Sequence, residues 1–195
     1  KSGELTDLAM ERVWAEIADA LATPKPSRFI QVLRDCGALA RLLPEVEALF
    51  GVPQVAQYHP EVDDGVHVKM SMDCAAALAD GRPPAEVVFA VLMHDLGKGI
   101  TPEDELPSHR GHEMAGLPLV EAVCERLRVP GEFRDLALIV CKLHLRCHRL
   151  PEMRPEKIMR LIESADFLRR PQRIDNFLAA CEADYRGRKG LGDRP

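Results

Sequence analysis

Apolar positions recur at helical spacing along most of the chain. In the segment MERVWAEIADAL, Val13, Trp14, Ile17 and Leu21 fall on one face, because residues three and four apart are neighbours on a helix. No stretch shows the strict alternation of apolar and polar residues that is typical of a half-buried strand. The pattern therefore predicts an all-α fold.

Prolines and glycines divide the chain into the predicted helices, since proline favours the first turn of a helix and glycine the position after its end. After the first helix, the pattern predicts a helix over 27–37, short helical turns around Pro44, and then helices over about 65–79, 83–95, 112–127, 132–145, 155–169 and 171–185. The run GVPQVAQYHPEVDDG, at 51–65, has two prolines and no helical period. We therefore predict two domains, a helical fragment over 1–52 and a larger domain over 53–190.

Composition narrows the class of protein. The 195 residues are 46% hydrophobic and 29% charged, which is typical of a soluble globular protein. No run approaches the ~18 apolar residues of a membrane span, and the start KSGELTD does not resemble a signal peptide, so we expect a cytoplasmic protein with no membrane partner. The six cysteines never form a C-x-x-C pair, which favours buried thiols over a zinc knuckle or a disulfide framework.

The most informative chemical feature is the doublet His94-Asp95, which ends the apolar run VVFAVLM. Taken alone, such a doublet is more often a surface ion pair or a helix cap. His67 precedes it and Asp166 follows it, however, and two imidazoles with two carboxylates are ligands that borderline divalent metals prefer. Consecutive helical residues point about 100° apart, so the doublet can serve one metal only near a helix end, which Gly97 supplies. We predict a metal site formed by His67, His94, Asp95 and Asp166.

Three further residues are candidates for catalysis beside Asp95. Lys98 lies in the predicted loop after the doublet, where its ammonium could reach a substrate phosphate as a mobile point charge. His112 and His144 lie on two later helices, and either one is a candidate to assist the departing oxygen or to hold the phosphate. A polar helix end explains each of these histidines equally well.

Two basic clusters near the end of the chain could follow an RNA backbone. They contain Arg169, Arg170, Arg173, Arg186, Arg188 and Lys189. Charge clusters of this size are more often solvated faces, so RNA contact is the less favoured of the two interpretations.

Several longer segments of the sequence resemble one family, the bacterial multifunctional CCA-adding enzymes. These are tRNA nucleotidyltransferases with a C-terminal HD domain. The matching blocks are RFIQVLRDCGALARLLPEVEALFGVPQ, YHPEVDDGVHVKMSMD, FAVLMHDLGKGITP, SHRGHEMAG, LRVPGEFRDLA and EADYRGR, and the resemblance covers nearly all of 5–188. It implies an HD-domain helical bundle preceded by a short part of the helical neck and body. The family's metal motif falls on His67, His94, Asp95 and Asp166, with His112 and His144 as looser, auxiliary ligands.

The resemblance also implies activities. They are those of a metal-dependent phosphohydrolase, namely 2′,3′-cyclic phosphodiesterase, 2′-nucleotidase and phosphatase, with Ni, Mg, Mn or Co as the divalent metal ion. The substrate would be a tRNA 3′ end or a cyclic or 2′-nucleotide, in tRNA 3′-end maturation and repair.

The family's catalytic head for nucleotide addition has a Gly-Ser motif followed by D-x-D, which this sequence lacks. We therefore expect a fragment that does not add CTP or ATP to tRNA. Two alternatives stay open, another HD-type nucleotide phosphohydrolase and a non-catalytic helical module that binds tRNA. The oligomeric state is not indicated by the sequence.

Overall fold

The computed structural model describes residues 9–57, 62–78 and 84–188, and this part of the chain contains no β-strand. The prediction of an all-α fold is confirmed. The helices are α1 (Met10–Leu21), α2 (Ser27–Asp35), α3 (Leu39–Leu42), α4 (Pro44–Glu47), α5 (Asp64–Ala77), α6 (Ala85–Met93), α7 (His112–Arg126), α8 (Gly131–Cys147), α9 (Pro155–Ser164) and α10 (Arg173–Arg186). Short 3₁₀ turns form η1 (Leu96–Ile100), η2 (Glu103–Glu105) and η3 (Leu150–Glu152).

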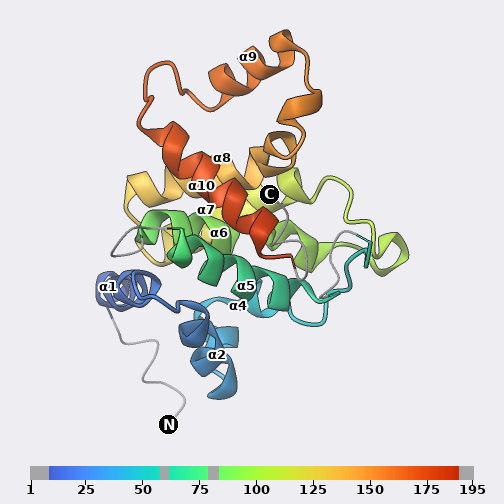
Figure 1. Cartoon of the computed structure of the whole chain (residues 1–195). Coiled ribbons are helices and arrows are strands. Elements are labelled where there is room, and N and C mark those ends of the chain that lie inside the picture. Colours follow the sequence, from blue (N-terminus) through green and yellow to red (C-terminus); the bar gives the residue numbers. More distant parts are fainter. Residues whose placement is uncertain (1–8, 58–61, 79–83, 189–195) are drawn as a thin grey trace.

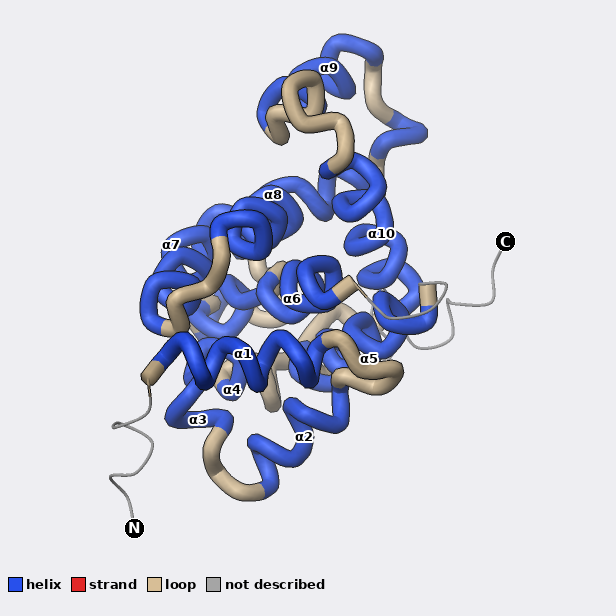
Figure 2. The backbone as a smooth tube through the Cα atoms, turned by 90° about the vertical axis from the view of Figure 1, so that its left-hand side faces the viewer, coloured by secondary structure: helices blue, strands red, loops and turns tan. Residues whose placement is uncertain are grey.

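Helix α6 is the centre of the bundle. All of its residues from Val87 to Met93 are buried, as expected for a helix that is apolar on every side. Helices α5, α8 and α10 all pack against it, and Figures 1 and 2 show it enclosed between them. The residues that end α6 are therefore placed in the middle of the protein, where side chains from several helices can meet.

The N-terminal helices share this core. The ring of Trp14 on α1 lies edge-on to Phe89 of α6 and Phe133 of α8, with ring centroids 5.2 and 5.0 Å apart. Arg126 on α7 donates to both carboxylate oxygens of Glu45 on α4, at 2.9 and 2.7 Å. One hydrophobic cluster runs from α1 to α10, and the domain division at 52 and 53 stays a prediction.

The predicted helix over 155–169 ends earlier in the structure. Asp166 has a positive φ of 56°, the amide of Phe167 donates to the carbonyl of Ile162, and that of Asp166 donates to Glu163. These two bonds form the Schellman motif that terminates a helix. Helix α9 therefore stops at Ser164 and stands away from the bundle between α8 and α10 (Figures 1 and 2). Residues 79 and 83, predicted ends of α5 and α6, lie outside the described residues.

Candidate metal centre

The doublet lies where α6 turns into η1. His94 closes α6 and Asp95 precedes η1, and both residues are 1% exposed. Gly97 allows η1 to touch α7, because a Cβ at this position would lie 2.0 Å from the carbonyl oxygen of His112. This close approach brings Nε2 of His112 to 3.0 Å from Oδ1 of Asp95.

One group of three possible metal ligands consists of His67 from α5, His94 from α6 and Asp184 from α10. One donor atom of each lies within 4.8 Å of the others, and all three side chains are buried. Oδ1 of Asp184 is 2.9 Å from Nε2 of His67 and 3.7 Å from Nε2 of His94. The two imidazoles and the carboxylate thus point toward a common centre from three different helices.

A second group shares His94 with the first. It adds Asp95 and His144 of α8, again with one donor atom of each within 4.8 Å of the others. Oδ1 of Asp95 lies 3.5 Å from Nε2 of His144, and the same oxygen faces His112. The structure therefore brings five of the predicted residues together at one place, namely His67, His94, Asp95, His112 and His144.

The orientation of three imidazoles is fixed by backbone carbonyls. Nδ1 of His94 donates to Val91 at 2.7 Å, and Nδ1 of His112 donates to His109 at 2.8 Å. Nδ1 of His144 likewise lies 3.1 Å from the carbonyl of residue 140. A proton held at Nδ1 leaves the lone pair at Nε2, which is the arrangement of a metal-binding histidine.

These Nε2 atoms face carboxylate oxygens, not donors. Nε2 of His94, Nε2 of His112 and Oδ1 of Asp95 are all buried without a hydrogen-bond partner in the described part of the chain. An imidazole lone pair and a carboxylate repel each other unless a cation or a proton lies between them. The donor set and its unpartnered atoms therefore fit a divalent metal ion.

The protonation of the cluster also suits a cation. Burial, together with the neighbouring His94, lowers the pKa of His144 to about 3, which keeps its imidazole neutral. Burial acts to raise the pKa of Asp95 and of Asp184, but the adjacent His94 and other donors outweigh it and hold both pKa values well below the usual value. Burial acts to lower the pKa of His94 and of His112, but the facing carboxylates outweigh it and raise both pKa values. A positive charge, either a proton or a metal cation, is therefore favoured between these side chains, beside the neutral imidazole of His144.

Lys98 is not the mobile loop residue that the sequence predicted. Its side chain is only 7% exposed, and its ammonium donates to Asp95 Oδ2 at 2.6 Å, Asp64 Oδ1 at 3.1 Å and Gln54 Oε1 at 2.6 Å. With all three protons directed at protein oxygens, the ammonium has no donor left for a substrate phosphate. The prediction of a mobile, exposed lysine is wrong, and Lys98 holds Asp95 in place, an arrangement that does not favour the predicted phosphate contact.

Asp166 is the other correction. It belongs to neither group of ligands, its side chain is 45% exposed, and its carboxylate lies 3.9 Å from both Arg169 and Arg170. Its place in the Schellman motif after α9 explains why it is directed away from the core. The carboxylate that meets the histidines is Asp184.

Asp184 was not among the predicted site residues, although the sequence contains a signal for it. Phe177, Ala180, Cys181 and Asp184 follow the i, i+3, i+4, i+7 spacing of one helix face, and the three residues before Asp184 in this series are apolar. All four are buried on α10. A carboxylate on a buried helix face requires a partner, whereas a carboxylate at the more exposed margin of a face, such as that of Asp166, can be solvated by water.

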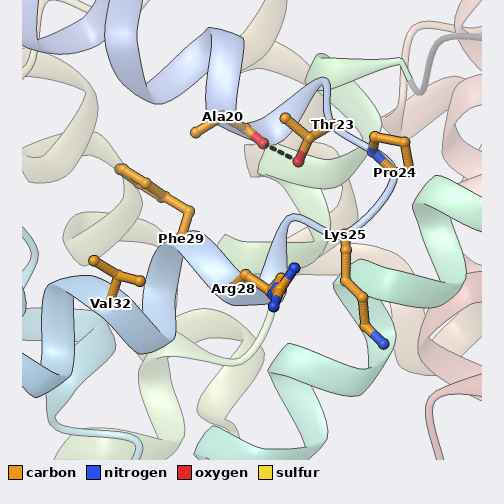
Figure 3. A pocket seen from close by; sticks show the side chains of 7 residues that line it. All are labelled: Ala20, Thr23, Pro24, Lys25, Arg28, Phe29 and Val32. Atoms are coloured by element: carbon orange, nitrogen blue, oxygen red, sulfur yellow. Dashed lines mark hydrogen bonds between the residues drawn. The ribbon is translucent and has the colours of Figure 1, made fainter.

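A separate hollow lies between α1 and α2, and its lining residues do not belong to the cluster. Its volume is about 570 Å³, and Figure 3 shows Phe29 and Val32 on one side with Lys25 and Arg28 on the other. The hydroxyl of Thr23 donates to the carbonyl of Ala20 at its edge. The hollow combines apolar walls with two cationic side chains.

The fold and the cluster define a class of protein. Residues 65–184 match the family model of the HD domain, and the chain belongs to this family. The matched range ends at Asp184, the carboxylate of the first ligand group. HD domains bind divalent metals, and the structure contains histidine and aspartate groups that could hold one.

Within this class, the chain is similar to proteins named Multifunctional CCA protein. It is 57% identical over 190 residues to the one from Cupriavidus taiwanensis, covering 97% of this chain and 45% of the relative. Identity is 51% over 195 residues with the one from Vibrio campbellii, and 53% over 194 residues with the one from Thioalkalivibrio sulfidiphilus, each covering 100% of this chain and 47% of the relative. The chain thus spans slightly less than half the length of these relatives.

Two further findings concern the rest of the chain. Residues 1–50 match a second family model, described as "Probable RNA and SrmB- binding site of polymerase A". In the described residues, each helix is too short or too polar to cross a membrane.

Proposed function

We propose that the chain is a metal-dependent phosphohydrolase that acts on 2′,3′-cyclic phosphates, 2′-nucleotides and other phosphoric esters at tRNA 3′ ends. One observation carries the proposal. The buried cluster presents imidazole Nε2 lone pairs and two ionised carboxylates at one point, and two ligand groups share His94. The similarity to Multifunctional CCA proteins supports a role in tRNA maturation, for which we propose a cytoplasmic location.

In this proposal, His67, His94, Asp95 and Asp184 hold the metal ion. Bound there, a divalent ion would polarise a phosphoryl oxygen and lower the pKa of a water molecule. His112 and His144 both face one oxygen, Oδ1 of Asp95, and complete the donor set of the cluster. Lys98 keeps the other oxygen, Oδ2, fixed by donating to it, so that Oδ1 stays directed at the histidines.

A panel of substrates tests the proposal. The purified chain should hydrolyse 2′,3′-cyclic AMP and 2′-AMP after addition of Ni, Mn, Co or Mg, and it should lose this activity in excess chelator. Asp95→Asn should be inactive in the same assay, since it removes a ligand charge. Turnover that is unaffected by chelator would contradict the proposal, and preferential hydrolysis of a deoxynucleoside triphosphate or guanosine tetraphosphate would favour the alternative HD-type nucleotide phosphohydrolase.

We also propose that the N-terminal helices contact tRNA. The family match over 1–50 and the hollow with Lys25, Arg28 and Phe29 support this second function. Lys25→Ala with Arg28→Ala should weaken tRNA binding and reduce its salt dependence by about two released counterions. Arg160→Ala, which removes an exposed cation on α9, is the matched control, and equal weakening in both proteins would contradict a specific contact.

A separate assay concerns nucleotide addition. With CTP, ATP and a tRNA that lacks its terminal CCA, we expect this chain to incorporate no nucleotide.

A further inference from the structure

The ligand cluster is closed to solvent on most sides. The side chains of His67, His94, Asp95, His144 and Asp184 are at most 3% exposed. His148, which follows α8, is more exposed than these ligands, with 16% of its side chain accessible. Its Nε2 lies 2.6 Å from Oδ2 of Asp184. The corner at His148 is therefore where solvent reaches the carboxylate of Asp184 most directly.

Two more side chains border this corner. Tyr185 is 40% exposed, and its ring centroid lies 6.2 Å from that of His148. The guanidinium of Arg188 lies 5.7 Å from the same tyrosine ring, and its Nη2 lies 3.9 Å from Oδ2 of Asp184. An aromatic face and a guanidinium thus stand side by side at the edge of the metal centre.

Arg188 has hydrogen-bonding capacity that the protein does not use. Its Nε is buried without a hydrogen-bond partner in the described residues, and its carboxylate contact at 3.9 Å is too long for a hydrogen bond. The side chain is nevertheless only 15% exposed, so the guanidinium is held next to the cluster and does not extend freely into water. Its planar fork of donors matches the oxygens of a phosphate.

We infer that Arg188 and Tyr185 form the nucleotide subsite of this centre. Arg188 binds the phosphate group of the substrate, and the exposed ring of Tyr185 stacks on its base, with His148 next to Tyr185 at the mouth. Stacking on an aromatic ring is the common way in which proteins bind an unpaired base. The subsite selects a nucleotide with a free base, such as the last residue of an RNA strand, over a simple phosphate ester. The inference rests on the proposed function, because it names the substrate contacts of that same site.

Titration with the two parts of the nucleotide separates the two contacts. Inorganic phosphate and adenosine are added separately to the metal-loaded protein, and their dissociation constants are measured by NMR or calorimetry. Arg188→Ala should weaken phosphate binding about tenfold or more, since it removes a charge-assisted hydrogen-bond donor. The dissociation constant of adenosine should not change in this variant. Tyr185→Ala should weaken adenosine binding about fivefold or more and leave the dissociation constant of phosphate unchanged. Tyr185→Phe, which keeps the aromatic ring, should bind adenosine normally.

The matched control is Arg186→Ala, which removes an exposed cation that pairs with Glu182 at 2.5 Å and should change neither constant. Metal content is measured for every variant. The inference is overturned if Arg188→Ala loses the metal, if Arg186→Ala has the same effect, or if neither ligand distinguishes the variants. Normal binding of both ligands without ester hydrolysis would uphold the subsite and contradict the proposed function, so the two failures are distinguishable.

Discussion

Asp184 and His67 are 117 residues apart in the sequence, and Oδ1 of Asp184 lies 2.9 Å from Nε2 of His67. The contact joins α5 to α10, which pack on each other on one side of α6. It closes the bundle around the end of α6 and places the carboxylate of Asp184, not that of Asp166, beside the histidines. The proposed metal centre therefore depends on the packing of the last helix as much as on the doublet.

Gly97 should tolerate no side chain. Gly97→Ala places a Cβ 2.0 Å from the carbonyl oxygen of His112 and 2.7 Å from the amide nitrogen of Gly116, both backbone atoms that cannot rotate away. We expect the free energy of unfolding to fall by at least about 2 kcal/mol, as measured in urea. Gly131→Ala, where a Cβ meets nothing within 4 Å, is the control and should be neutral or slightly stabilising. Equal stabilities for the two variants would show that η1 and α7 are not packed this closely.

Lys98 should be required for stability. Lys98→Met leaves the buried carboxylates of Asp64 and Asp95 without their shared cation, and removal of one partner from a buried ion pair costs about 3–5 kcal/mol. Adding Asp64→Asn should restore part of the loss, because it removes one of the unpaired charges. The exposed Lys157→Met on α9 is the control, with an expected change near zero. If Lys98→Met unfolds at the same urea concentration as this control, the buried network is not as described.

The predicted domain division can be tested with the only tryptophan of the chain. Trp14 lies on α1 but packs against Phe89 and Phe133, which belong to the larger predicted domain. We expect tryptophan fluorescence and helical circular dichroism to report one coincident unfolding transition, since both follow one shared core. Earlier loss of the fluorescence signal alone would show that the N-terminal helices unfold independently.

Metal binding should stabilise the fold. A ligand that binds only the folded state at 100 times its dissociation constant adds about 2.7 kcal/mol to the free energy of unfolding. Addition of a divalent metal to the chelated protein should therefore raise the melting temperature by several degrees. Asp95→Asn should lose this increase, and an unchanged increase in that variant would exclude Asp95 as a ligand.

The sequence was sufficient for the helical class, and it predicted five of the residues that the structure brings together. The doublet His94-Asp95 follows a uniformly apolar helix, and such a helix lies in the core, so the doublet could be placed correctly from local pattern alone. The apolar face that contains Asp184 favours this carboxylate over Asp166, but the pattern alone does not show which of the two helices brings its carboxylate to the histidines. The outcome depends on where α9 ends. Asp166 itself adopts the left-handed conformation after this helix, and its carboxylate lies near Arg169 and Arg170.

Lys98 shows a second limit of the sequence. The residues around it predict a loop, and lysines in loops are usually exposed. Its burial results from Asp64 and Gln54, which come from segments 34 and 44 residues earlier in the chain. Long-range partners of this kind have no local signal in a single sequence.

We propose that Asp184, and not Asp166, completes the metal centre of a phosphohydrolase. The most direct measurement is the metal content per chain of Asp184→Asn and Asp166→Asn, together with 2′,3′-cyclic AMP hydrolysis in the same preparations. We predict that Asp184→Asn loses bound metal and nearly all activity while Asp166→Asn, which changes an exposed carboxylate, retains both. Loss of metal in Asp166→Asn, or full metal content and activity in Asp184→Asn, would contradict the account.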